Sequence, residues 1–434
     1  MNTKLLNFLN DSPTCFHAIS NMRKELKEKG FTELFEGSSW NLEENKNYFV
    51  VRNESSIIAF KIPENKDFTG FMISASHSDS PCFKVKENPE IISNGIVKLN
   101  VEKYGGMLIN PWFDRPLSVA GRLIIKEDGL FTTRLVNVDE PFLVIPNVAI
   151  HMNRKANDGY TFNVQTDLLP VYGEEETAKG TFIKTMAEQA GLKEEDILGH
   201  DLFVYPYGKG TLWGKDKAFL SSPRLDDLQC AFACLQGFIS AKASTSVPVF
   251  ACFDNEEVGS GTKQGADSTF LEDTLNRISA ACNKDSEGFY RAIASSFMVS
   301  ADNAHAIHPN HGELTDPTNK PQMNKGVVIK YNANQKYTTD AVSASILKDI
   351  CQGAKVPVQE FVNRSDMPGG STLGNLSNAH VSLNAADIGL AQLAMHSTYE
   401  TCGSKDTAYL CQLMTAFFGC SLQEEGRGSY RLTI

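Results

Sequence analysis

An apolar run of strand length ends abruptly in polar and acidic residues in the stretch Val247-Pro248-Val249-Phe250-Ala251-Cys252-Phe253-Asp254-Asn255-Glu256-Glu257. Three further apolar runs share this design: residues 70–76 lead into His77, residues 297–301 into Asp302, and residues 388–395 into His396. Helix-like stretches lie between and after these runs, at 226–240, 269–282, 340–352 and 397–418. Apolar strands that alternate with amphipathic helices predict an α/β domain whose central sheet is buried on both faces. The ionisable residues then follow the carboxyl ends of the strands, where such sheets bind ligands.

The stretch 88–220 has a different pattern, with short alternating strands and little helical periodicity. Its turn sequences are Asn94-Gly95, Tyr104-Gly105-Gly106 and Asp128-Gly129. This pattern predicts a β-rich domain inserted into the α/β domain. We therefore expect a discontinuous catalytic domain, built from residues 1–87 and 221–434, and an inserted domain built from residues 88–220.

The composition is that of an ordinary globular protein, with 434 residues of which 41% are hydrophobic and 21% are charged. The formal charge of -11 argues against a nucleic acid or a membrane as partner, because both attract basic surfaces. No apolar run approaches the roughly 20 residues that span a bilayer, and the N-terminal residues are too polar for a signal peptide, so we expect a cytoplasmic protein. The ten cysteines include no Cys-x-x-Cys pair, so the chemistry is expected to come from His, Asp and Glu.

Nitrogen and oxygen ligands for a metal are available at five separated positions, which are His77, Asp226, Glu257, Asp302 and His396. Glu256 stands beside Glu257, and two adjacent carboxylates after a buried strand repel each other unless a cation lies near them. A divalent metal would remove that cost. One carboxylate of the pair would bind the metal while the other remained free as a general base. The alternative is an acidic helix N-terminus that interacts with the helix dipole.

Five separated motifs follow one another along the chain in a fixed order. They are Ser76-His77-Ser78-Asp79-Ser80-Pro81, Ser222-Pro223-Arg224-Leu225-Asp226-Asp227-Leu228, Asp254-Asn255-Glu256-Glu257-Val258-Gly259-Ser260, Ser300-Ala301-Asp302-Asn303-Ala304-His305-Ala306-Ile307-His308-Pro309-Asn310 and Ala394-Met395-His396-Ser397. With these motifs the chain resembles the aspartyl aminopeptidase family from its first helix to its last. The resemblance is specific because the motifs keep both their order and their spacing.

The resemblance implies a fold and an assembly. The fold would be that of a zinc peptidase, with a mixed central sheet flanked by helices and an inserted β-rich domain that forms dimers. The subunits would assemble further into tetrahedral dodecamers. Each subunit would hold two divalent metal ions, Zn²⁺ by family likeness, although sets of carboxylates and imidazoles also accept Co²⁺ and Mn²⁺.

The resemblance also implies a role for each candidate site residue. Asp226 would bridge the two metal ions; the remaining ligands would be His77 and Asp302 for one ion and Glu257 and His396 for the other. Glu256 would be the general base toward the attacking water. Asp79 would orient the imidazole of His77 and fix its tautomer.

Residues for substrate binding follow from the same resemblance. Lys330 would pair with a carboxylate of the first substrate side chain, and Tyr337 would donate a hydrogen bond to it; the alternative for Lys330 is a strand-end lysine that faces solvent. Gly370 lies in the glycine-rich stretch 366–374, which resembles a substrate loop of the family but would also suit a simple turn. His151 matches a histidine that reaches the active site of a neighbouring subunit, or it is a structural residue of the inserted domain.

The expected function is a metal-dependent aminopeptidase that releases N-terminal residues, preferentially Asp or Glu, from peptides with a free N-terminus. The reaction would proceed by attack of a dimetal-bound water on the scissile carbonyl. One alternative keeps the fold but changes the substrate, as a broad or leucine-preferring aminopeptidase in which Lys330 is idle. Another is an inactive homologue that only forms a shell, against which the unbroken set of ligands argues.

Overall fold

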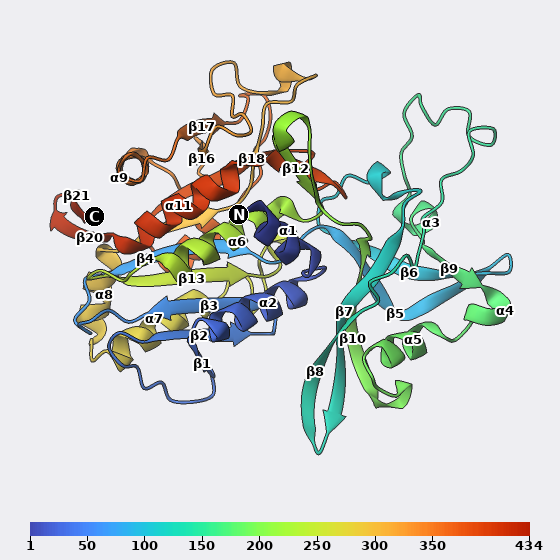
Figure 1. Cartoon of the computed structure of the whole chain (residues 1–434), viewed down its shortest axis with the longest axis horizontal. Coiled ribbons are helices and arrows are strands. Elements are labelled where there is room, and N and C mark those ends of the chain that lie inside the picture. The colour runs from blue at the N-terminus through green and yellow to red at the C-terminus, as the bar shows by residue number, and fades with distance from the viewer.

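The computed structural model describes all residues 1–434 and contains two separate large sheets (Figure 1). A thirteen-stranded mixed sheet with helices on both faces makes up the larger part of the molecule. A six-stranded antiparallel sheet with short helices lies to one side of it, on the right in Figure 1. The predicted fold class, a mixed central sheet flanked by helices with a second β-rich part, is confirmed.

Four parallel strands form the centre of the large sheet, in the order β13-β4-β14-β18. Their bounds are β4 (Phe71–His77), β13 (Val247–Phe253), β14 (Phe297–Ala301) and β18 (Asn384–Leu393). The first three are buried along their whole length, as expected of strands covered on both faces. Because the four strands are parallel, their carboxyl ends meet at one edge of the sheet, and this edge carries the candidate site.

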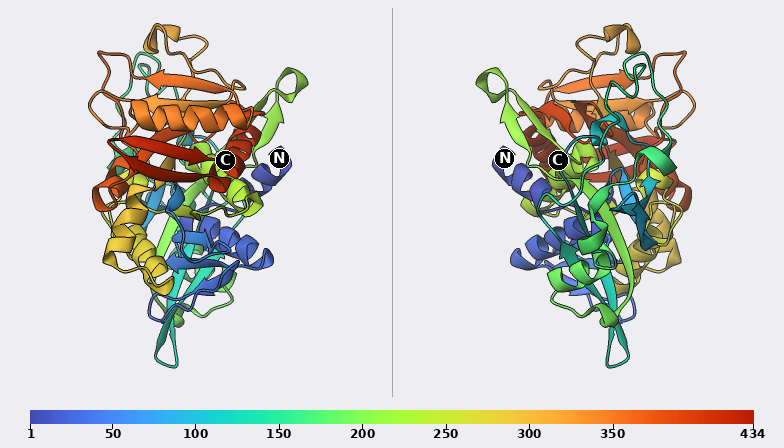
Figure 2. Two further views of the ribbon diagram at one scale, coloured as in Figure 1. Left: turned by 90° about the vertical axis from the view of Figure 1, so that its left-hand side faces the viewer. Right: turned by 90° about the vertical axis from the view of Figure 1, so that its right-hand side faces the viewer.

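The outer strands make the sheet mixed, because β3 joins β13, and β16 and β19 join β18, in antiparallel orientation. The outer strands are β1 (Thr32–Leu34), β2 (Asn47–Arg52), β3 (Ser56–Lys61), β11 (Thr211–Trp213), β12 (Phe219–Ser222), β15 (Ala304–His305), β16 (Val327–Tyr331), β17 (Val358–Val362) and β19 (Glu400–Gly403). The chain ends in a separate hairpin of β20 (Ser421–Gly426) and β21 (Ser429–Thr433), which faces the viewer in the left view of Figure 2.

Helices cover both faces of the large sheet, each face with its own apolar core. One core is formed with α1 (Asn2–Asn10), α2 (Cys15–Glu28), α6 (Leu225–Ser240), α9 (Ala341–Gly353) and α11 (Asp406–Gly419). The other is formed with α7 (Phe270–Ala281), α8 (Ser286–Ala294) and α10 (Leu373–His380). Fully buried side chains such as Phe238 and Phe417 on the first face and Leu275 on the second fix the sheet between the two layers.

The second sheet has the strand order β8-β7-β10-β5-β6-β9 and its own apolar core, which includes Phe83, Trp112 and Phe182. Its elements are β5 (Cys82–Ser93), β6 (Ile96–Tyr104), β7 (Leu117–Glu127), β8 (Leu130–Asn137), α3 (Val164–Asp167), β9 (Val171–Glu174), α4 (Glu175–Ala178), α5 (Phe182–Gln189) and β10 (Ile197–Pro206). The turn sequences Asn94-Gly95 and Asp128-Gly129 join hairpins, and both residues of each have positive φ, as in a type I′ turn. Short 3₁₀ turns complete the chain at Asn110–Trp112, Glu194–Asp196, Lys215–Lys217, Glu256–Val258 and Gly312–Leu314.

The stretch 397–418 is not a single helix, so this prediction is wrong in its first third. Strand β19 occupies residues 400–403 and α11 begins only at Asp406. The reason is tertiary: β19 is held between β18 and β12, and a side chain at Gly403 would clash with the backbone nitrogen of Asn324. None of the helices combines the length and the apolar character that crossing a bilayer requires.

Candidate metal centre

The predicted ligands all lie at the carboxyl edge of the four parallel strands. His77 is the last residue of β4, and Asp302 directly follows β14. Glu256 and Glu257 lie in the 3₁₀ turn after β13; Asn255, which precedes them, has the positive φ of 63° that asparagine tolerates better than most residues. Asp226 lies in the first turn of α6, and His396 follows β18.

Asp226 lies between the two histidines. Its Oδ1 is 3.4 Å from Nε2 of His77, and its Oδ2 is 3.5 Å from Nε2 of His396. The two oxygens of one carboxylate therefore face two different imidazoles. Burial by itself would raise the pKa of Asp226, but the imidazoles of His396 and His77 hold it well below its ordinary value.

The other predicted residues complete two groups around Asp226. Oε1 of Glu257 lies 3.4 Å from Nε2 of His396, while Oδ1 of Asp302 and Oε2 of Glu256 each lie 4.0 Å from Nε2 of His77. Potential ligand atoms of His77, Asp226 and Glu257 all lie within 4.8 Å of one another. The structure thus brings all five predicted ligands and Glu256 into one cluster.

The donor set suits divalent cations. Two buried carboxylate oxygens, Oδ1 of Asp226 and Oε1 of Glu257, have no hydrogen-bond partner, which is costly for a charged group unless a cation binds it. Burial raises the pKa of Glu256 to about 8; His77 opposes this rise and Asp302 adds to it. Carboxylates this crowded are stable together only with positive charge among them, and imidazole and carboxylate ligands are those that zinc accepts.

Asp79 connects His77 to the turn that carries the two glutamates. Its Oδ1 lies 3.3 Å from Nδ1 of His77, and its backbone oxygen lies 3.1 Å from the same nitrogen. The carboxylate accepts hydrogen bonds from the backbone N–H groups of Glu256 and Glu257, at 3.2 Å each, and from the hydroxyl of Tyr104 at 2.7 Å. Asp79 therefore fixes the orientation of the His77 ring and the position of the turn together.

Two buried carboxylates at the site were assigned no role from the sequence. Asp227 accepts a hydrogen bond from the backbone N–H of His77 at 3.1 Å, and its ligand atoms cluster with those of Asp226 and Asp302. Glu400, in β19, accepts from the backbone N–H groups of Asp226 at 3.1 Å and His396 at 2.7 Å. The adjacency of Asp226 and Asp227 was a visible signal for the first residue, whereas nothing local distinguishes Glu400 from a surface glutamate.

A cavity of about 220 Å³ opens onto the cluster and contains the three residues predicted to bind substrate, Lys330, Tyr337 and Gly370. Lys330 is buried, with its Nζ 3.5 Å from Oδ2 of Asp302 and 5.4 Å from the centre of the Tyr337 ring. Burial favours a neutral amine, but Asp302 and the further acidic groups around it together outweigh burial, and the pKa of Lys330 lies above its ordinary value. Lys330 is therefore a cation that faces the site. The alternative, a strand-end lysine that faces solvent, is wrong.

His151 is the one predicted site residue that does not join the cluster within a single chain. It is exposed, in an irregular stretch between β8 and α3, and it does not line the cavity at the metal centre.

A protein-family model described as "Aminopeptidase I zinc metalloprotease (M18)" matches residues 8–418. The chain belongs to the M18 aminopeptidase family. A probable M18 family aminopeptidase 2 of Clostridium novyi is 46% identical over 422 residues, which is 96% of this chain and 98% of the relative. The corresponding protein of Pseudomonas fluorescens is 40% identical over 424 residues, with the same coverage.

Solved structures of M18 aminopeptidases share the fold. The chain from a complex of Ape4 and Nbr1 has a TM-score of 0.93 and 38% sequence identity, over 96% of this chain and 85% of that one. The mApe1 dodecamer of S. cerevisiae gives a TM-score of 0.84 and 27% identity, over 96% and 95% of the two chains. The protein is thus an M18 metallo-aminopeptidase, a peptide hydrolase of a family of zinc metalloproteases.

Proposed function

We propose that this aminopeptidase removes N-terminal Asp or Glu from peptides at a centre of two divalent metal ions, most simply Zn²⁺. The observation that carries the proposal is the position of Asp226, whose two carboxylate oxygens face His77 and His396 separately. In this proposal Asp226 is shared between both ions. The other ligands are His77 and Asp302 for one ion and Glu257 and His396 for the other.

The metal ions, when bound, polarise the scissile carbonyl and lower the pKa of the attacking water. The protein supplies the proton transfer: Glu256 accepts the proton of this water and donates it to the leaving amine. Its Oε2, 4.0 Å from Nε2 of His77, belongs to the cluster, yet its neighbour Glu257 is the one that faces His396. In this proposal Glu256 is the base and its neighbour Glu257 is a metal ligand.

Lys330 and Tyr337 supply the preference for an acidic first residue. A carboxylate of the substrate side chain that enters the 220 Å³ cavity meets the buried ammonium group of Lys330. A substrate carboxylate would give this ammonium group a second anionic partner beside Asp302, which a neutral side chain cannot do, so the cavity discriminates against neutral side chains. Gly370 lines the same cavity; a side chain at this position would meet no other atom within 4 Å, so this glycine leaves space open beside the substrate.

The β-rich insertion, residues 88–220, is proposed to be the dimerisation domain, and twelve subunits are proposed to assemble from such dimers. Two observations support this proposal. The second sheet has a separate apolar core, and the similar mApe1 of S. cerevisiae is described as a dodecamer. Exposed apolar residues lie on both sides of His151, including Val148, Ile150 and Met152, as expected of a surface that another subunit covers. In the dimer His151 would act in the active site of the neighbouring subunit as a hydrogen-bond donor to the oxyanion.

Glu256→Gln tests the assignment of the base. The amide keeps the shape of the side chain but cannot accept the proton, so turnover of an aspartyl peptide should fall by roughly 10²–10⁴-fold. Metal content, measured by elemental analysis of the same sample, should stay at the wild-type value. A Glu256→Gln enzyme that turns over at the wild-type rate would remove Glu256 from the mechanism.

A rate profile across Asp, Glu, Leu and Lys amides tests the substrate class. The wild-type enzyme should prefer Asp and Glu, and Lys330→Ala should lower kcat/KM for these two by roughly 30-fold or more, while kcat/KM for Leu changes little. Lys325→Ala, at an exposed lysine just before β16, is the matched control. An acidic preference that survives in Lys330→Ala, or a wild-type preference for Leu, would refute the pocket assignment and leave the family membership intact.

A further inference from the structure

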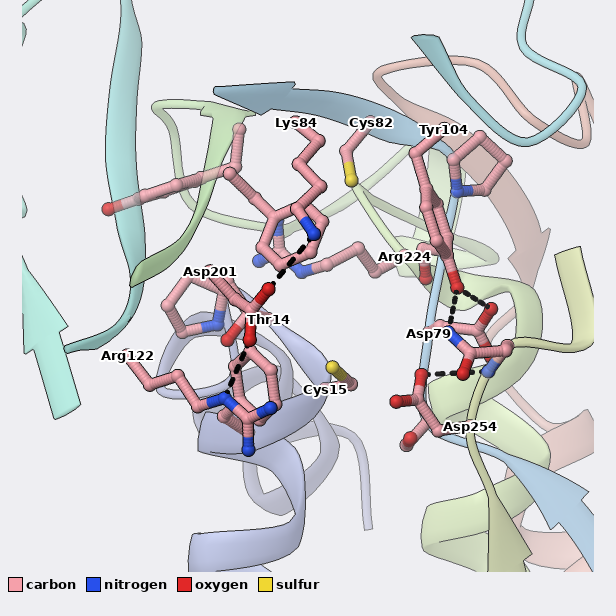
Figure 3. Close-up of a pocket in the computed structure, with 18 of the residues that line it drawn as sticks. Thr14, Cys15, Asp79, Cys82, Lys84, Tyr104, Arg122, Asp201, Arg224 and Asp254 are labelled. Atoms are coloured by element: carbon pink, nitrogen blue, oxygen red, sulfur yellow. Dashed lines mark hydrogen bonds and ion pairs between the residues drawn. The ribbon is translucent and has the colours of Figure 1, made fainter. Parts of the chain in front are cut away.

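A second cavity, of about 300 Å³, lies where α2 and the second sheet meet the large sheet (Figure 3). It shares no lining residue with the cavity at the metal centre. Its volume is at the lower end of the range of small-molecule sites, roughly 300–1,000 Å³, which fits a ligand of a few heavy atoms and not a peptide. None of the residues proposed for catalysis uses this space except Asp79, which lines it.

The cavity contains a half-buried cation without a counter-ion. The guanidinium of Arg224 has one hydrogen bond, from Nη2 to the backbone oxygen of Leu9 at 3.0 Å. Its Nε and Nη1 atoms are buried and have no hydrogen-bond partner. An unpaired buried charge is costly, and an anionic ligand would offset that cost.

A second wall adds further positive charge. Asp201 accepts from Nζ of Lys84 at 2.9 Å and from Nε of Arg122 at 2.8 Å, so one carboxylate faces two cations. This wall therefore keeps an excess of one positive charge. With Arg224 it makes one side of the cavity attractive to a carboxylate group.

The opposite side of the cavity is acidic. Figure 3 shows Asp79 and Asp254 across the cavity from Lys84 and Arg122. Both acids are buried, with 4% and 3% of their surface exposed. Positive and negative charge are thus separated across a small space, which favours a ligand that carries one charge of each sign.

The remainder of the lining is apolar or weakly polar. The rings of Phe16, Phe203 and Tyr205 line the cavity, and Figure 3 shows the thiols of Cys15 and Cys82 between the charged groups. These surfaces suit an uncharged, apolar substituent on the ligand.

We propose that this cavity binds a free α-amino acid with an apolar side chain. The carboxylate of the amino acid faces Arg224 and Lys84, and its ammonium group faces Asp79 and Asp254. The choice of ligand rests on the family's reaction, which releases free amino acids, and not on the preference for Asp or Glu. The site shares no lining residue with the metal-centre cavity; Asp79, which contacts His77, and Ser80, which donates to the backbone oxygen of Asp226 at 2.8 Å, connect its wall to the proposed ligands.

A crystal of the metal-loaded enzyme soaked with L-selenomethionine tests the location directly. The ligand is a free apolar amino acid, and its selenium gives an anomalous signal that marks its position. A selenium peak inside the cavity, beside the rings of Phe16 and Phe203, is the expected result. A peak only at the metal centre, or no peak at all, would overturn the proposal.

Equilibrium dialysis with radiolabelled L-methionine tests the two charged contacts in solution. N-acetyl-L-methionine, which lacks the ammonium group, and L-methioninol, which lacks the carboxylate, should each compete at least roughly tenfold more weakly than L-methionine. Equal competition by either compound would refute the proposed contacts without the need for any variant.

Substitutions in the cavity test the same contacts by changing the protein instead of the ligand. Arg224→Gln should weaken binding of L-methionine by roughly tenfold or more. Cys82→Phe, which fills the cavity, should abolish it. Arg134→Gln, at an arginine of β8 that does not line the cavity, is the matched control and should bind as the wild type does. Unchanged binding in Cys82→Phe would place the ligand elsewhere and overturn the proposal.

Discussion

Asp79 shows how much of the site's geometry depends on a residue that is not itself a proposed ligand. Its carboxylate holds two backbone N–H groups of the glutamate turn, the hydroxyl of Tyr104 and the imidazole of His77. These partners together offset part of the cost of burying its negative charge.

Asp79→Asn should therefore weaken metal binding, because an amide accepts on only one of its two atoms and no longer polarises His77. We expect metal affinity to fall by roughly 10–100-fold, measured by dialysis against a zinc buffer. Tyr104→Phe is the matched control, since it removes a single hydrogen bond to the same carboxylate and should have a much smaller effect. Equal metal affinity in Asp79→Asn and wild type would show that Asp79 does not tune the ligand.

The candidate ligands could be predicted from the sequence because each follows a recognisable strand or motif, as His77 follows an apolar run. Glu400 could not be predicted, since its role depends on the pairing of β19 with β12, which brings it to the backbones of Asp226 and His396. Lys330 needed the structure for the same reason: the sequence allowed a solvent-facing lysine, and only the fold buries it beside Asp302.

At the scale of elements, the end of α6 is capped by a lysine from a neighbouring strand. Nζ of Lys61, the last residue of β3, donates to the backbone oxygens of Ile239 at 3.2 Å and Ala241 at 2.6 Å. A cation is favourable beside helix C-terminal carbonyls, yet no carboxylate is among its hydrogen-bond partners. Burial lowers the pKa of Lys61 from 10.5 to about 8.

The lowered pKa predicts a pH dependence of stability. Between pH 8 and 10.5 the unfolded chain binds a proton at Lys61 that the folded chain does not, so the free energy of unfolding gains from this group as pH rises. Relative to Lys61→Met, the wild type should gain roughly 1–2 kcal/mol between pH 8 and pH 10 in urea unfolding. Lys29→Met, at the exposed end of α2, is the control; an identical pH profile in Lys61→Met and wild type would contradict the prediction.

The parallel strands were the most predictable elements, because β4, β13 and β14 are continuous apolar runs that match their buried length. Antiparallel edge strands were less predictable. β19 is four residues long and lies directly before α11, so the sequence pattern predicts its residues as the first turn of a helix. Only its pairing with β18 and β12 determines its conformation.

At the scale of the whole molecule, the second sheet has its own core. The chain segments that precede and follow it in the sequence both contribute strands to the large sheet. β5 begins at Cys82, only five residues after His77, and β11 and β12 return to the large sheet soon after β10 ends at Pro206. The second sheet is therefore connected to the large sheet by short segments at both ends. The alternation of short strands and turns predicted the β-rich part, whereas its relation to other subunits is not encoded in any local pattern.

Mixed dimers test the proposed role of His151 across subunits. His151→Ala and Glu256→Gln should each be nearly inactive alone. After dissociation and re-assembly together, half of the random dimers are mixed, and one of their two sites has both residues, so about a quarter of wild-type activity should return. Re-assembly of His151→Ala with itself is the control. A mixture no more active than its components would place His151 outside the neighbouring site.

Asp79 lines the second cavity and also contacts His77 at the metal centre, which has a practical consequence for inhibitor design. Compounds aimed at metallopeptidases generally carry a chelating group, and that group limits their selectivity among enzymes with the same metal. A compound that fills the second cavity beside Phe16 and Phe203 and displaces Tyr104 from Asp79 would need no such group. Its selectivity would depend on the junction of α2 with the second sheet, a surface that metallopeptidases of other architectures do not possess.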